Sequence, residues 1–187
     1  MSSPPAMRRG EKAMTPEQVE ELLRHGFSGR LGTVGADGFP YVVPLLYVWM
    51  DGAIWVHNTR ARGHLRQNVD HEARVCFEVD EPGEVFAYGR FECDSSVAYR
   101  SVIAFGRIAV VEERAAKQRF CEALLAKYAH ESGDRPKGFF PRLDQITVYA
   151  ITVERLTGKA TPLPAADQRW PAVDQTRTPN AVPPAGR

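Results

Sequence analysis

The sequence predicts a mainly β fold, an antiparallel barrel of six to seven strands with helices packed at its ends. Segments rich in β-branched and aromatic residues recur through most of the chain, and turn signals such as Asp37-Gly38 and Asp51-Gly52 separate them. Helical patterns occur only three times, once early, once between strands and once late. Strands therefore dominate, and a sheet closed on itself accommodates them best.

The composition indicates one folded domain. With 187 residues, 43% of them hydrophobic and 25% charged, the chain is long enough to bury a proper core. Lysine and arginine total 24 against 23 aspartates and glutamates, so no broad positive field is expected to attract nucleic acid or a membrane surface.

The cysteines and the hydropathy pattern favour a cytoplasmic protein. Cys76, Cys93 and Cys121 are widely spaced and lack metal-ligand spacing, so they are expected to be buried thiols in a reducing compartment and not part of a metal site. Residues 1–9 lack the apolar stretch of a signal peptide, and no apolar run approaches the roughly 18 residues of a membrane span.

The first element is a helix, predicted over Pro16–His25. Thr15 and Gln18 form a capping box, Pro16 suits the first helical position and Gly26 can end the helix. A strand over Gly29–Val34 follows, and Asp37-Gly38 then supplies the tight turn of a hairpin.

The longest apolar run, Pro40–Met50, predicts one strand that is covered on both faces. Pro44 lies in its middle and cannot donate a hydrogen bond to a neighbouring strand. Two interpretations stay open: Pro44 marks a place where the sheet opens, or it is an edge-strand proline that protects against aggregation.

The remaining elements follow the same patterns. In chain order they are a strand 53–58, a helix 63–70, a strand 74–79, a turn 81–83, strands 84–91 and 99–111, a helix 112–128, a loop 132–143 and a strand 146–156. The proline-rich end lacks apolar periodicity and is expected to be extended or disordered. The chain thus divides into an N-terminal extension 1–14, a barrel domain 15–160 and a tail 161–187.

The segment from His57 to Asn68 carries the clearest chemical signal. It places cationic and hydrogen-bonding side chains where a strand leads into a helix, and free N–H groups at a helix start favour a phosphate. The alternative is a solvated basic loop that happens to precede a helix. His57 could be a structural histidine, a ligand contact or a general acid. Motifs of covalent hydrolases and nucleotide kinases are absent.

Several ordered motifs resemble one known family. They are G-R-L-G-T-V, D-G-F-P-Y-V-V-P-L, W-V-H-N, G-H-L-R-Q-N, R-V-C-F-E-V-D, Y-R-S-V-I-A-F-G-R and L-T-G-K. Together, from about Thr15 to Lys159, they resemble the pyridoxamine 5′-phosphate oxidase-like flavin proteins, and among these the 5-nitroimidazole reductase (nitroimidazole-resistance) branch.

The resemblance implies an FMN-binding split β-barrel and a homodimer with two flavin sites at the subunit interface. FMN would lie along Val43, Pro44, Leu45 and Leu46. Its phosphate would fall on Asn58, Thr59, Arg62, Gly63 and His64, within the segment that ends at Asn68. Tyr99, Arg100, Ser101 and Val102 would lie close to a flavin, some of them reaching the cofactor of the other subunit. His57 matches the histidine near the reactive face of the ring and is the catalytic candidate.

The implied function is an FMN-dependent oxidoreductase that takes electrons from a donor such as NADH or NADPH and passes them to a small acceptor, for example a nitroaromatic compound. The chain lacks the dense Ser-Arg-Lys cluster and the C-terminal arginine motif of true pyridoxamine phosphate oxidases, which disfavours vitamin B6 oxidation. Two alternatives stay open: a non-catalytic module that stores or senses flavin, and a barrel that binds haem or a deazaflavin instead.

Overall fold

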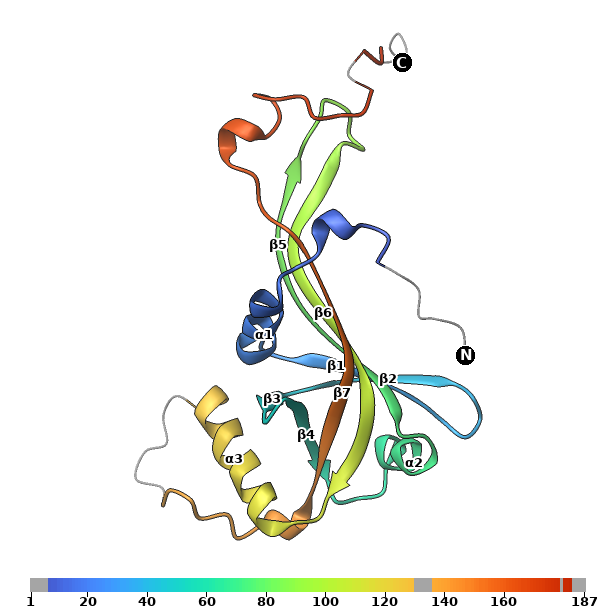
Figure 1. The fold of residues 1–187 in the computed structure, drawn as a ribbon, viewed down its shortest axis with the longest axis vertical. Coiled ribbons are helices and arrows are strands. Elements are labelled where there is room, and N and C mark those ends of the chain that lie inside the picture. Colours follow the sequence, from blue (N-terminus) through green and yellow to red (C-terminus); the bar gives the residue numbers. More distant parts are fainter. Residues whose placement is uncertain (1–6, 130–135, 179, 183–187) are drawn as a thin grey trace.

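The computed structural model describes residues 7–129, 136–178 and 180–182. Within them, one antiparallel sheet of seven strands is flanked by three α-helices (Figure 1). The strands are β1 (Gly29–Val34), β2 (Pro40–Leu45), β3 (Tyr47–Met50), β4 (Ala53–Thr59), β5 (Arg74–Ala87), β6 (Ser95–Val111) and β7 (Ile146–Thr161). The helices are α1 (Pro16–His25), α2 (His64–His71) and α3 (Arg114–Tyr128), with 3₁₀ turns at Gly10–Lys12, Leu143–Gln145 and Ala166–Gln168.

The order of the strands shows that the barrel is split. The sheet runs β2-β1-β5-β6-β7-β4-β3, so its two edges, β2 and β3, are consecutive in the chain and separated only by Leu46. The sheet curls until these edges meet at Leu46, but β2 pairs only with β1 and β3 only with β4. The closed barrel expected from strand content was therefore wrong, and the split barrel implied by the family resemblance is confirmed.

The run Pro40–Met50 forms two strands and not the one strand predicted, with Leu46 between them. Its two halves form hydrogen bonds with different neighbours, and the opening of the sheet begins at Leu46, two residues beyond Pro44. Pro44 lies opposite Arg30 within β2, an edge strand, where proline is tolerated because one side of the strand needs no donor. Its position fits the edge-strand interpretation.

Two apolar clusters hold the fold together. The larger one fills the concave side of the sheet and includes Leu22 of α1, Leu65 of α2 and Tyr149 of β7. The smaller one lies between the opposite face of β3, β4 and β7 and the helix α3, where Phe120 is fully buried beside Trp55. Helices α1 and α2 thus cover one side of the sheet, and α3 covers β3 and β4 on the other.

Strand β5 passes straight through the predicted turn at 81–83, which was therefore wrong. The chain forms a bulge between Pro82 and Val85 and continues to pair with β6. Only β6 pairs with β5 there, because β1 reaches β5 no further than Glu78, so the missing N–H of Pro82 leaves no gap in a second ladder. The hairpin turn lies instead between Tyr88 and Asp94, whose backbone N and O atoms are 2.9 Å apart.

Strands β5, β6 and β7 continue beyond the barrel as a long arm (Figure 1). Strand β7 ends at Thr161, five residues after its predicted end, because it keeps pairing with β6 as far as Tyr99. The described part of the tail is irregular but packs on the tip of the arm, where the backbone N–H of Gln175 donates to the carbonyl of Tyr88 at 2.7 Å. Residues 1–6 of the predicted N-terminal extension, 132–135 of the predicted loop, and 179 and 183–187 of the tail lie outside the described residues.

Among the described helices, none is both long and apolar enough to cross a bilayer.

Candidate functional site

The candidate site is the opening between β2 and β4, here called the seam. Strand β3 pairs with β4 from Ala53 to Val56, and beyond that point His57–Thr59 pair only with β7. Strand β2 likewise pairs only with β1. Both strands therefore present unpaired backbone edges that diverge from Leu46, and the predicted cofactor residues Val43–Leu46 and His57–Thr59 border them.

Helix α2 is joined to β2 beside the seam. The ring of His64, the first residue of α2, stacks on the ring of Tyr41 in β2 with centroids 4.9 Å apart and planes 22° apart. One turn further along the same face of α2, the buried amide of Asn68 donates to Thr33 Oγ1 at 3.0 Å. Asn68, a predicted cofactor-binding residue at the end of the phosphate segment, is thus occupied in holding α2 against β1.

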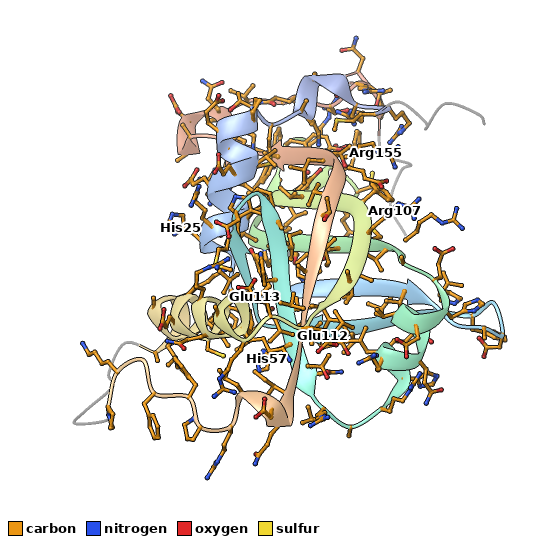
Figure 2. All side chains as sticks on the ribbon, turned by 60° about the horizontal axis from the view of Figure 1, so that its bottom comes forward. His25, His57, Arg107, Glu112, Glu113 and Arg155 are labelled. Carbon is orange, nitrogen blue, oxygen red and sulfur yellow. The ribbon has the colours of Figure 1, made fainter. Side chains whose placement is uncertain are left out.

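Strand β4 directs its predicted site residues to opposite faces, because successive side chains alternate. Asn58 points to the concave side, where the hydroxyl of Tyr149 donates to its Oδ1 at 3.3 Å. His57 points to the other side, and its ring lies 5.5 Å from that of Phe120 in α3. Thr59, at the exposed end of β4, pairs with Ile146. Figure 2 labels His57 beside α3.

His57 is held in a largely apolar environment. Its Nδ1 atom is buried and has no hydrogen-bond partner among the described residues. Burial lowers the pKa of His57 below its usual value, because desolvation disfavours the charged ring. The imidazole is therefore neutral at pH 7, when it carries one donor and one acceptor.

The N-terminus of α2 suits an anion. Gly63 is the N-cap residue and provides no capping side chain, so the first N–H groups of the helix lack a side-chain acceptor. A Cβ atom built on Gly63 would meet nothing within 4 Å, so space is open at this point. A phosphate would satisfy these N–H groups and face the positive end of the helix dipole.

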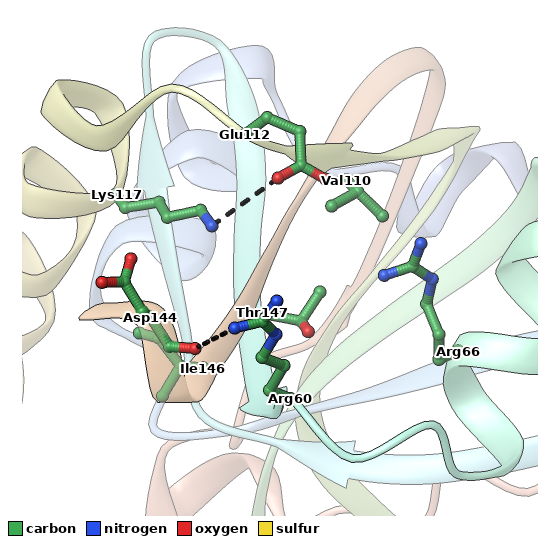
Figure 3. Close-up of a pocket in the computed structure, with 8 residues that line it drawn as sticks. All are labelled: Arg60, Arg66, Val110, Glu112, Lys117, Asp144, Ile146 and Thr147. Atoms are coloured by element: carbon green, nitrogen blue, oxygen red, sulfur yellow. Dashed lines mark hydrogen bonds and ion pairs between the residues drawn. The ribbon is translucent and has the colours of Figure 1, made fainter. Parts of the chain in front are cut away.

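The structure distributes the arginines differently from the prediction. Arg62, predicted to bind phosphate, has a side chain that is 70% exposed and pairs with Asp70 at 2.5 Å. Arg60, Arg66 and Lys117 instead line a pocket of about 400 Å³ below β4 and β7 (Figure 3). Sequence reasoning missed this trio, because Lys117 comes from α3 and no local pattern connects it to the segment His57–Asn68.

The four predicted residues of β6 lie on the arm, away from α2. Val148 of β7 pairs with His57 on one side and with Val111 of β6 on the other. Ser101 lies ten residues before Val111 on β6, which is on the order of 30 Å along the strand. Val102 is buried in the core, and Arg100 pairs with Glu81 at 2.6 Å and Glu21 at 3.1 Å. Tyr99 and Ser101 occupy the other face of β6. Within a single chain, these four residues therefore lie far from the seam.

Over β2, β1, β5 and β6 the convex face of the sheet is apolar in part, and no described helix covers it there, since α3 packs on β3 and β4. Strand register places Ile103 and Phe105 of β6 on this face together with Cys76 of β5 and Val42 of β2. Val42 is 62% exposed and Ile103 is 36% exposed. An uncovered apolar sheet face of this kind is typical of a protein interface.

Several solved structures share this fold. Solved structures with the same fold include a candidate 5-nitroimidazole antibiotic resistance protein from Bacteroides thetaiotaomicron, with 18% identity, TM-score 0.66 and coverage of 79% of this chain and 85% of that one. The flavocytochrome Anf3 from Azotobacter vinelandii has 18% identity, TM-score 0.71 and coverage of 97% and 91%. An FAD and haem binding protein from Mycobacterium smegmatis has 19% identity, TM-score 0.69 and coverage of 84% and 78%.

No curated protein sequence matches the chain. Residues 15–160 match the family described as pyridoxamine 5′-phosphate oxidase. The matched segment is most of the 187-residue chain and includes all of the split barrel up to Ala160. The resemblance inferred from the ordered motifs is confirmed by this match. The chain therefore belongs to the pyridoxamine 5′-phosphate oxidase family.

Proposed function

We propose that this chain binds FMN at the seam and acts as an FMN-dependent oxidoreductase. The observation that carries the proposal is the pair of unpaired strand edges that diverge from Leu46 beside the uncapped N-terminus of α2. A planar ring with donors and acceptors on its rim can pair with such backbone edges, and its phosphate can meet the helix start.

The residues that would hold FMN follow from this arrangement. The backbone of Val43–Leu46 would contact the ring, while Asn58, Thr59, Gly63 and His64 would surround the phosphate. The Tyr41–His64 stack fixes the start of α2 relative to β2, so the two halves of the site are held at a set spacing. Arg62 would add long-range positive charge, since its guanidinium is already paired with Asp70.

We also propose a homodimer with FMN at the interface. The uncovered convex face offers the apolar surface, and Tyr99 and Ser101 share that face but lie far from the seam of their own chain. In a dimer that buries this face they would reach the flavin of the partner subunit. A single chain accordingly provides only part of each site.

Bound FMN would supply two-electron redox chemistry, passing electrons from NADH or NADPH to a small acceptor such as a nitroaromatic compound. The neutral His57 would orient the acceptor by a hydrogen bond. The likeness to the candidate 5-nitroimidazole resistance protein supports this class of acceptor. Cys76, Cys93 and Cys121 are free thiols, in keeping with the proposed reducing compartment, but the expectation that they are buried was wrong: Cys93 is exposed and the other two are half-buried.

A second candidate function is a non-catalytic module that stores or senses flavin. The orientation of His57 favours it, because the ring packs on Phe120 and its Nδ1 atom has no partner within the described residues that could relay a proton. On this alternative the apolar walls hold the flavin and no side chain takes part in chemistry.

Absorption spectra and turnover of the purified protein test the proposal. We expect the bands of oxidised flavin, oxidation of NADH or NADPH with a nitroaromatic acceptor at a rate above that of free FMN, and at least a tenfold lower rate in His57→Ala with FMN affinity retained. His25→Ala, which changes an exposed histidine at the end of α1, is the matched control and should behave as the wild type.

The outcomes separate the candidates. Binding of FMN without turnover in either protein would favour the storage or sensing module. A haem or deazaflavin spectrum, or no affinity for FMN, would overturn the proposal.

A further inference from the structure

The pocket below β4 and β7 is separate from the seam. It lies between α2, the start of α3 and the first residues of β7, on the β7 side of β4, whereas the seam lies on the β3 side (Figure 3). Its volume is about 400 Å³. FMN bound at the seam would therefore leave this pocket unfilled.

Three cationic side chains from three elements face this pocket. Arg60 follows β4, Arg66 belongs to α2 and Lys117 belongs to α3. Figure 3 shows their charged ends directed toward the centre of the cavity. Like charges that converge in this way repel one another, and an anion between them would relieve the repulsion.

The neighbouring carboxylates only partly neutralise these cations. Lys117 has a side chain that is only 13% exposed, yet its nearest carboxylate, that of Glu112, is 3.9 Å away. Arg60 donates to the backbone carbonyl of Asp144 at 3.3 Å. Arg66 pairs with Asp70 at 2.9 Å, but Asp70 is shared with Arg62.

The balance of charge around the pocket is positive. The side chains concerned are the cations Arg60, Arg62, Arg66, Arg114 and Lys117 and the carboxylates of Asp70, Glu112 and Asp144. Asp144 pairs with Arg114 at 3.5 Å, outside the trio that faces the cavity. Of the residues that line the pocket itself, three are cations and two are carboxylates. This leaves an excess of one positive charge, which favours an anion in the cavity.

We propose that this pocket binds a phosphate-bearing group additional to the phosphate of the flavin, an inference that deepens the proposed function. Guanidinium groups bind phosphate oxygens in pairs, and lysine adds a point charge. The volume lies in the range of small-molecule sites and exceeds what one free phosphate fills. The group comes either from the diphosphate of a dinucleotide flavin that continues past the loop between β4 and α2, or from a separate nucleotide.

Calorimetric titrations of the full chain in a phosphate-free buffer test the inference. The proteins are the wild type, Arg66→Gln, Lys117→Gln and the double variant, each checked for an unchanged melting curve. Arg119→Gln is the matched control, because Arg119 also lies on α3 but pairs with Asp51 at 3.5 Å, away from the pocket. The probes are pyrophosphate on flavin-free protein, ADP on FMN-loaded protein, and FAD compared with FMN.

We expect pyrophosphate to bind the wild type and the control alike, and each pocket variant to bind it at least tenfold more weakly, as charge-assisted hydrogen bonds predict. FAD at least tenfold tighter than FMN, with the advantage lost in the double variant, would identify the dinucleotide flavin as the source. ADP binding to FMN-loaded protein, with equal affinities for FAD and FMN, would identify a separate nucleotide.

Two results keep this inference distinct from the proposed function. In the first, flavin binds, but the affinities for pyrophosphate, ADP and FAD are the same in the wild type and in the Arg66 and Lys117 variants. The pocket inference is then overturned and the flavin proposal stands. If pyrophosphate binds through Arg66 and Lys117 but no flavin binds, the pocket remains an anion site and the proposed function fails.

Discussion

Ile103→Glu is expected to dissociate the proposed dimer and to remove most of the bound flavin. Ile103 lies in the middle of the uncovered convex face, next to Glu78 of β5 and Thr157 of β7. A second copy packed on this face would bury the new carboxylate beside Glu78, where the nearby cations are already engaged: Arg30 pairs with Glu78 at 3.3 Å and Arg155 lies over the ring of Phe105. Burial of an unpaired charge costs several kcal/mol, so we expect the dimer to weaken at least 100-fold.

Light scattering coupled to gel filtration, with the flavin absorbance per chain, measures both effects. We expect the substitution to leave folding intact, because Ile103 is already 36% exposed in one chain, and a melting curve checks this. Leu125→Glu is the matched control: Leu125 is 48% exposed on α3, which covers β3 and β4 and not the strands around Ile103, so dimer and flavin should persist. A dimer that survives Ile103→Glu would contradict the interface, and a monomer with full flavin would contradict a site shared between subunits.

Phe120→Ala is expected to lower the free energy of unfolding by about 3–5 kcal/mol, the range for truncating a buried phenylalanine. Phe120 is fully buried, stacks with Trp55 at a centroid distance of 6.5 Å and contacts the ring of His57. It is the main anchor of α3 on β3 and β4, and the smaller apolar cluster has few other large side chains to fill the space.

Urea unfolding followed by circular dichroism measures this loss. Leu125→Ala on the same helix removes a half-exposed leucine and should cost less than about 1 kcal/mol, as surface changes usually do. A loss below about 1.5 kcal/mol in Phe120→Ala would show that α3 is held by contacts other than this ring.

The same variant should change the pH dependence of stability through His57. The pKa of His57 is lowered in the folded state, whereas in the unfolded chain it is about 6.5. As the pH falls below about 6.5, the unfolded chain therefore binds a proton at His57 before the folded chain does. The wild type should therefore lose stability as the pH falls from about 6.5 toward the folded pKa. In Phe120→Ala the ring is more hydrated and this acid-induced loss should shrink, which urea titrations at several pH values would show.

Short-range signals predicted a large part of the architecture. The capping box of Thr15 and Gln18 forms as expected, and α1 and β1 have their predicted bounds, since both depend on neighbouring residues. Asp51-Gly52 adopts the positive φ angles of a tight hairpin turn. The uncapped helix start at Gly63, on which the proposed phosphate site rests, also follows from local order, because helix starts expose N–H groups whatever surrounds them.

Long-range pairing decided the rest. Whether Pro40–Met50 forms one strand or two depends on which neighbours pair with each half, and Pro82 stays in a strand because only β6 pairs with it there. His57 and Asn58 are adjacent in sequence, yet α3 covers one and the barrel interior holds the other.

The sequence alone was enough for the family, the strand content and the segment where phosphate chemistry is expected, because these depend on residue order over short distances. The tertiary structure was needed for the seam, which exists only because the sheet curls until β2 and β3 meet at Leu46. It was also needed for the cationic pocket, since Lys117 approaches Arg60 and Arg66 only when α3 packs across β4. Contacts between distant segments arise from packing of the whole chain, and no local pattern encodes them.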